Sequence, residues 1–294
     1  MLAAAPPALA SGLRLIRATG EDVRAFLQGQ LTADLRRLAP NRALPAGLLS
    51  PKGRLLAVLT LIEDRDGSVL IEVRAELREA LLKRLRMFIL RARVQLSPLD
   101  QGALLFGSGP CLQAAGWSAP LPQAVWEQVS GADGLLIRRP GPDRLLWIAP
   151  SAAADIAADD EGWRLAEIRA GAAVIWPETQ DRHVPQMAGL ERLGALAFDK
   201  GCYTGQEIVA RLHYLGEAKR ALFRLAGDGP APAPGSSLRT ADAAAAGEVL
   251  DAVALGSGFE ASAVLLISAA SQPLRTEDGR PVTVRADPAT PAPA

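Results

Sequence analysis

The residues best suited to chemistry in this chain lie close together at residues 200–207, which read KGCYTGQE. They include Cys202, one of two cysteines, and Lys200, one of four lysines. A neighbouring cation and the positive end of a helix both favour the thiolate form of a cysteine. Residues 206–214 have the apolar spacing of a helix, so the pattern predicts a reactive thiol at Cys202 that Lys200 activates. The alternative is a buried cysteine that only packs at a helix start.

The other residues able to bind a metal are scattered along the chain. His183, His213, Cys111 and Cys202 match no closed ligand spacing for zinc or for an iron–sulfur cluster. We therefore expect no metal ion held by this chain alone. Residues 107–110 (GSGP) begin like a dinucleotide-binding loop, but Leu112 stands where its third glycine belongs.

The elements that must position these residues follow an α+β pattern. Residues 55–62 and 69–73 predict two strands joined by a turn at Asp66-Gly67. Residues 77–89 carry leucines at helical spacing and predict a helix, and residues 151–168 predict a mainly helical segment that contains Trp163. Strands followed by a helix are typical of a layered α+β fold rather than a doubly wound sheet.

Towards the C-terminus the pattern changes to short strands separated by turn residues. This spacing predicts a small β-barrel, with strands at residues 221–225, 247–255, 261–268 and 282–284. We therefore expect four regions: a loose tail (1–12), an α+β core (13–218), the barrel (219–286) and a disordered tail (287–294).

The bulk composition excludes several classes of function. The 294 residues carry 32 basic and 32 acidic side chains, so no net charge draws the chain to nucleic acid or to an acidic membrane. The longest apolar stretch, residues 55–62, is far too short to cross a bilayer. Two cysteines distant in sequence indicate reduced thiols and a cytoplasmic protein. We expect a monomer with transient partners, without direct nucleic acid contact and without a membrane.

Five segments resemble the YgfZ family, in the expected order. Residues 200–211 (KGCYTGQEIVAR) look like its hallmark motif, and residues 28–34 (QGQLTAD) and 50–54 (SPKGR) look like its N-terminal segments. Two further segments lie between the N-terminal segments and Cys202, namely residues 163–171 (WRLAEIRAG) and 184–186 (VPQ). The family comprises folate-binding proteins that maintain iron–sulfur enzymes, and it is related to T-protein, the aminomethyltransferase of the glycine cleavage system.

The resemblance implies a T-protein-like folate-binding fold, with two ferredoxin-like α+β subdomains around a central cleft and a small C-terminal β-barrel. It also implies tetrahydrofolate as the ligand. Trp163 aligns with a tryptophan that the family implicates in folate binding, and Leu13 stands where a second tryptophan is expected. T-proteins typically carry a glutamate where this chain has Arg169. A carboxylate accepts hydrogen bonds from the N–H groups of a pterin, whereas a guanidinium can only donate them. Lys52 and Arg169 are candidates to pair with the folate carboxylates.

Three functions follow from this resemblance. The first is an accessory protein that binds folate, supports iron–sulfur client enzymes including radical-SAM enzymes that modify tRNA, and uses Cys202 as a functional thiol. The second is a folate-dependent aminomethyltransferase, which would not depend on Cys202 and which Arg169 counts against. The third is a folate-sensing interaction module without chemistry, which would tolerate loss of Cys202.

Overall fold

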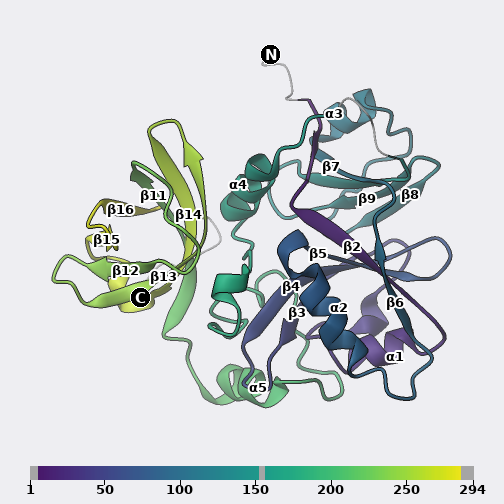
Figure 1. Ribbon diagram of the computed structural model, residues 1–294, viewed down its shortest axis with the longest axis horizontal. Coiled ribbons are helices and arrows are strands. Elements are labelled where there is room, and N and C mark those ends of the chain that lie inside the picture. Colours follow the sequence, from purple (N-terminus) through teal and green to yellow (C-terminus); the bar gives the residue numbers. More distant parts are fainter. Residues whose placement is uncertain (1–5, 152–155, 286–294) are drawn as a thin grey trace. The chain divides into compact units, whose positions relative to one another are not determined.

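A computed structural model describes residues 6–151 and 156–285, in which the chain forms two compact units (Figure 1). Residues 1–46, 59–163 and 199–203 belong to the first unit, and residues 47–58, 164–198 and 204–294 to the second. The predicted tail at 287–294 lies outside the described residues. The helices are α1 (Val23–Gln28), α2 (Arg78–Arg86), α3 (Gly109–Ala114), α4 (Asp160–Ala170) and α5 (Gln206–Leu215).

The first of two five-stranded sheets contains the two strands predicted at residues 55–62 and 69–73 as neighbours. It contains, in spatial order, β3 (Leu44–Leu49), β4 (Leu55–Glu63), β5 (Val69–Arg74), β2 (Leu13–Thr19) and β6 (Gln95–Leu99). Gly67 has a φ of 80° in the β4–β5 turn, a conformation that glycine adopts without steric cost. Helix α2 covers part of this sheet through contacts with β2 and β6, and buries Leu81, Leu82 and Leu85 as the leucine spacing predicts.

The second sheet of five strands lies within the first unit. It contains, in spatial order, β1 (Ala8–Leu9), β7 (Ala103–Gly107), β10 (Leu145–Ala149), β9 (Gly134–Arg138) and β8 (Gln128–Gly131). One apolar cluster joins the two sheets, with Leu15 and Ile62 from the first and Ile137 and Ile148 from the second. The core of this unit therefore lies between the sheets.

Two predictions at the edges of this unit were wrong. The tail does not extend to residue 12, because Ala8 and Leu9 pair with Phe106 and Leu105 and so add an edge strand to the second sheet. Helix α4 begins only at Asp160, so the helical segment is shorter than the predicted 151–168; residues 152–155 lie outside the described residues.

The C-terminal barrel is confirmed and closes with six strands. They are, in spatial order, β11 (Arg220–Asp228), β14 (Gly258–Leu266), β13 (Ala245–Leu255), β12 (Ser237–Thr240), β15 (Leu274–Thr276) and β16 (Pro281–Arg285). Strands β12 and β15 have four and three residues, which is too short for a recognisable alternation of apolar residues.

The boundary between the two units differs from the expected division at residue 219. Residues 164–198 group with the barrel, and charged side chains of this segment pair with its strands. Arg164 bonds Asp251 of β13 at 3.0 Å, and Arg169 bonds Glu260 of β14 at 2.6 Å. These partners are separated by about ninety residues along the chain, which local sequence patterns do not connect.

Candidate functional site

The loop that carries Cys202 (the thiol loop, residues 199–203) is anchored by a buried lysine. The side chain of Lys200 donates hydrogen bonds to the backbone oxygens of Leu31 at 2.7 Å and Ala33 at 2.6 Å. Lys200 is only 8% exposed. An ammonium group has three donors and no acceptor, so it suits a pocket made of carbonyl oxygens. The lysine thereby joins two segments that resemble the family, 28–34 and 200–211.

Burial changes the proton affinity of Lys200 and of its neighbour Tyr203. The Lys200 ammonium lies 5.0 Å from the centre of the Tyr203 ring. Burial lowers the pKa of Lys200 to about 8, although the Asp34 carboxylate acts in the opposite direction. Burial also raises the pKa of Tyr203 to about 12. Near neutral pH the lysine therefore keeps its charge against a desolvation cost.

Asp34 organises the segment that accepts the lysine. Its carboxylate caps the short turn at Leu35–Arg37 by accepting the backbone N–H of Arg36 at 3.1 Å, and it pairs with the Arg36 guanidinium at 2.8 Å. Gln28 donates to the same carboxylate at 3.0 Å, and the Arg36 guanidinium also reaches the backbone oxygen of Asp199 at 3.2 Å. Arg36 holds the pKa of Asp34 far below its ordinary value. Asp34 thus supports the loop structurally.

The two cysteines occupy opposite environments. Cys202 is a free thiol and exposed, whereas Cys111 is buried, and burial raises the pKa of the Cys111 thiol. Helix α5 begins at Gln206, as the apolar spacing predicts, so Cys202 lies four residues before the helix and outside its first turn. A cavity of 280 Å³ adjoins the thiol loop through Gly201, the residue before Cys202; its other lining residues are Arg24, Ala25, Gln28, Leu35 and Arg36.

In the second unit, α5 packs against the hairpin that carries Lys52. Gly205 has a φ of 80°, and a Cβ there would lie 2.6 Å from the backbone oxygen of Ser50. A Cβ on Gly53 would lie 2.6 Å from the Cβ of Ile208. Both glycines are therefore required by this contact. The sequence motifs contain both glycines, but no local pattern predicts that Gly53 and Gly205 lie at the same contact.

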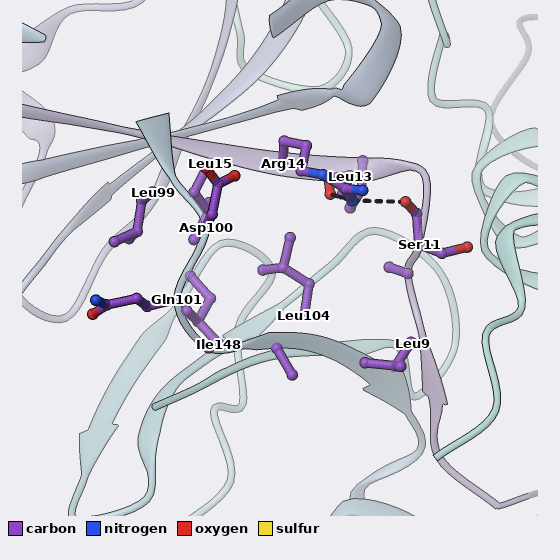
Figure 2. A pocket seen from close by; sticks show the side chains of 13 residues that line it. Leu9, Ser11, Leu13, Arg14, Leu15, Leu99, Asp100, Gln101, Leu104 and Ile148 are labelled. Atoms are coloured by element: carbon purple, nitrogen blue, oxygen red, sulfur yellow. Dashed lines mark hydrogen bonds between the residues drawn. The ribbon is translucent and has the colours of Figure 1, made fainter. Parts of the chain in front are cut away.

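The predicted folate residues Leu13 and Trp163 come together in the first unit. They belong to one buried apolar cluster with Ala10 and Leu146. Leu13 also lines a cavity of 410 Å³, which Figure 2 shows with Arg14 and Asp100 among its polar residues. Its lining residues are Leu9, Ala10, Ser11, Leu13, Arg14, Leu15, Leu99, Asp100, Gln101, Gly102, Ala103, Leu104 and Ile148.

Trp163 supports the core of this unit and does not line that cavity. It is 2% exposed, and the Phe106 ring meets it edge-on at 5.5 Å. The guanidinium carbons of Arg139 and Arg144 lie 5.2 and 5.1 Å from its ring centre. A pterin that stacks on this ring must displace one of these groups.

A buried ion pair lies beside Trp163, and the sequence did not predict it. Arg139 bonds Glu72 and the Thr60 hydroxyl, each at 2.7 Å, and its guanidinium also lies 4.9 Å from the ring centre of Trp126. Side chains of Arg139 and Glu72 are only 7% and 6% exposed. A glutamate inside the apolar strand at residues 69–74 was the available signal, because a buried carboxylate needs a cation.

Comparisons with known proteins decide the family. No family model matches the chain. The chain is 35% identical over 222 residues to "tRNA-modifying protein YgfZ" of Shigella boydii serotype 18, covering 71% of this chain and 68% of that protein. The protein of the same name from Escherichia coli strain SE11 matches equally well, at 35% identity over 222 residues. The chain belongs to the YgfZ family. This confirms the resemblance read from residues 28–34 and 200–211.

A solved structure confirms the T-protein-like fold of this YgfZ family member. Aminomethyltransferase T of the glycine cleavage system from Bartonella henselae superposes with a TM-score of 0.77, covering 98% of this chain and 87% of that one. Sequence identity is 18%, so this likeness concerns the fold alone.

Two predicted folate-binding cations of this YgfZ family member lie in its second unit, and they differ in environment. Arg169 pairs with Glu260, and this contact holds the pKa of Glu260 below its ordinary value. Lys52 is exposed at the hairpin, and within residues 6–151 and 156–285 it has no hydrogen bond or ion pair. Their roles towards folate stay predictions.

The described residues also show two absences. No three side chains among their histidines, cysteines, aspartates and glutamates gather where they could hold a metal ion. None of their helices combines the length and the apolar character needed to span a membrane.

Proposed function

We propose that this YgfZ family member is a folate-binding accessory protein that supports iron–sulfur enzymes, including those that modify tRNA, with Cys202 as its functional thiol. The observation that carries the proposal is an exposed thiol on a loop that a buried lysine holds in place. Related proteins named as tRNA-modifying support the link to tRNA.

In this proposal Lys200 positions the thiol rather than activating it. Its ammonium is directed to the oxygens of Leu31 and Ala33, and a buried cation without these acceptors would be costly. A loop fixed at this point presents Cys202 to a client at a lower entropic cost than a mobile loop. The exposed thiol is then accessible to a client that docks at this loop.

The cavity that Leu13 lines supports folate as the ligand. Its volume of 410 Å³ lies within the range of small-molecule sites, roughly 300–1,000 Å³. Leu13, Leu104 and Ile148 supply the apolar contact that an aromatic ring system needs. Asp100 offers a carboxylate to the N–H groups of a pterin, in competition with its ion pair to Arg78. Arg14 donates to the backbone oxygen of Ser11 at 2.8 Å and offers its other N–H groups to a glutamate tail. Bound tetrahydrofolate supplies a carrier of one-carbon groups.

Calorimetry with tetrahydrofolate tests the ligand. We expect the wild type to bind, Asp100→Ala to weaken binding at least tenfold, and the exposed barrel variant Glu277→Ala to bind like the wild type. Absence of binding by the wild type contradicts the folate proposal. Normal binding by Asp100→Ala contradicts only the placement in this cavity, and a loss in Trp163→Phe would then locate folate beside that ring.

A matched pair of cysteine variants tests the thiol. Cys202→Ala should abolish support of iron–sulfur client activity in cells that lack the native protein, whereas Cys111→Ala should retain it. If Cys202→Ala supports client activity fully, the thiol is not required, and the folate-sensing module is the function that fits. Turnover of an aminomethyl group by Cys202→Ala would establish the transferase instead.

A further inference from the structure

The turn after α2 exposes an unusual set of apolar side chains. Met87, Phe88 and Leu90 are 60%, 42% and 91% exposed. Single exposed apolar residues are ordinary, but three within four residues form a patch, and patches mark interaction sites. Phenylalanine and methionine are also among the residues common at interaction surfaces. We refer to residues 83–93, which contain this patch, as the basic–apolar turn.

The basic–apolar turn is strongly cationic in a chain with no net charge. It contains five basic residues and no acidic one: Lys83, Arg84, Arg86, Arg91 and Arg93. Arg93 is neutralised by ion pairs with Glu21 and Asp22. Among the described residues, the other four make no ion pair with a carboxylate. The absence of net charge over the whole chain therefore conceals a local positive surface.

Helix electrostatics explain only part of this charge. Lys83, Arg84 and Arg86 occupy the last turn of α2, where cations interact favourably with the helix dipole. Arg86 also donates to the backbone oxygen of Leu96 at 2.7 Å, which is a structural role. Neither reason applies to Arg91, which lies beyond the helix, nor to the exposed Phe88. Glu79, one turn before Lys83, pairs with Arg78 at 3.3 Å and leaves Lys83 unneutralised.

The cations and the aromatic ring are arranged for a flat, anionic partner. The guanidinium carbon of Arg84 lies 5.8 Å from the centre of the Phe88 ring, so two planar groups adjoin each other at the surface. A hollow of 520 Å³ at the end of α2 is lined by Glu79, Leu82, Lys83, Arg86 and Met87, three of which belong to the basic–apolar turn. Proteins bind single-stranded nucleic acid by stacking bases on aromatic and guanidinium planes while cations contact the phosphates.

We propose that the basic–apolar turn binds a single-stranded segment of RNA, such as a tRNA loop. The choice of tRNA rests on the proposed function, whereas the preference for a single strand rests on Arg84 and Phe88. An acidic membrane would attract the same cations and could bury Met87 and Leu90. The observation that favours a base is the guanidinium of Arg84 beside the Phe88 ring, because both are planes on which a base can stack.

Binding of fluorescently labelled, unfractionated tRNA to the full chain tests the proposal. With about three cations engaged, the logarithm of the binding constant should fall with a slope of about −2 against the logarithm of salt concentration. The triple variant Lys83→Gln, Arg84→Gln, Arg91→Gln should lose most of this slope and bind at least tenfold more weakly. Phe88→Ala should weaken binding roughly tenfold through lost stacking.

A control variant of equal charge change is available on the barrel. Lys219→Gln, Arg239→Gln, Arg275→Gln removes three exposed cations from the second unit and should bind tRNA like the wild type. An unlabelled single-stranded RNA should compete better than a duplex. Tetrahydrofolate binding by the same variants should be unchanged, so a failure here is distinguishable from a failure of the folate proposal.

Several outcomes would overturn the proposal. They are absence of tRNA binding at low salt, equal loss in the barrel control, and equal competition by duplex RNA. Sedimentation with anionic lipid vesicles but no binding to tRNA would assign the turn to a membrane. A concentration-dependent dimer that the triple variant abolishes, again without tRNA binding, would assign it to a second copy of the chain.

Discussion

Replacing Lys200 with methionine tests how the thiol loop is anchored. The substitution Lys200→Met keeps the length of the side chain but removes its charge and both hydrogen bonds to the oxygens of Leu31 and Ala33. Each buried carbonyl left without a donor costs about 1–3 kcal/mol. The variant also removes the desolvation cost of a buried ammonium, so the two effects oppose each other near neutral pH.

The pH dependence separates the two effects. Burial lowers the pKa of Lys200 to about 8 from an ordinary value of 10.5. A pKa depressed by folding contributes stability that is present above the unfolded pKa and is lost as the pH falls through the folded pKa. Between pH 7 and pH 9.5, folded Lys200 loses its proton while the unfolded lysine keeps it. The wild type should therefore gain about 2 kcal/mol relative to Lys200→Met over this interval.

Urea denaturation of both proteins at pH 7 and pH 9.5 measures this difference. Tyr203 contributes little in this interval, because its ordinary pKa of 10.0 and its folded pKa of about 12 both lie above it. We expect the free energy of unfolding of the wild type minus that of the variant to increase with pH. A difference that does not change with pH would show that Lys200 keeps an ordinary pKa and would refute the argument from burial.

Four further substitutions have expected outcomes. Cys202→Ala should change the free energy of unfolding by less than about 0.5 kcal/mol and remove the fast reaction with a thiol reagent, since Cys202 is exposed; a large destabilisation would mean that it packs in the core. Trp163→Ala should cost about 3–5 kcal/mol in urea denaturation, and a neutral result would contradict its burial. Glu72→Gln should cost about 3–5 kcal/mol because it removes the carboxylate with which Arg139 pairs in a buried site; an unchanged midpoint would show that this ion pair contributes nothing to stability. Gly205→Ala should lower the melting temperature, because its φ is 80° and a Cβ would lie 2.6 Å from a backbone oxygen; an unchanged melting curve would argue against this contact.

Local patterns predicted the elements that carry their own signal. The leucine spacing of α2 and the turn at Asp66-Gly67 indicated a helix and a hairpin, and both are present. The strands that were missed include the longer β2 and β3 as well as the edge strand β1 and the short strands β12 and β15. The last three have two to four residues and exist only because a longer strand offers them hydrogen bonds.

The same distinction applies to the candidate site. The motif at residues 200–207 identified Cys202 as the thiol to examine, and burial of Cys111 agrees with that choice. The motif assigned Lys200 to the thiol, but the structure directs its ammonium to two backbone oxygens of the segment 28–34. Hydrogen bonds between residues 167 or more positions apart leave no periodic signal in either segment.

Motif spacing and the alternation of apolar residues are local properties of the chain, so they were sufficient to predict the family, the α+β class and the C-terminal barrel. Which charges are buried, and which partners they have, depends on tertiary contacts. Lys200, Arg139 and Arg169 have the same sequence character as any surface cation. Their environments differ because folding places a carbonyl, a buried carboxylate or a barrel glutamate beside each, and electrostatic free energy depends on distance and burial rather than on sequence separation.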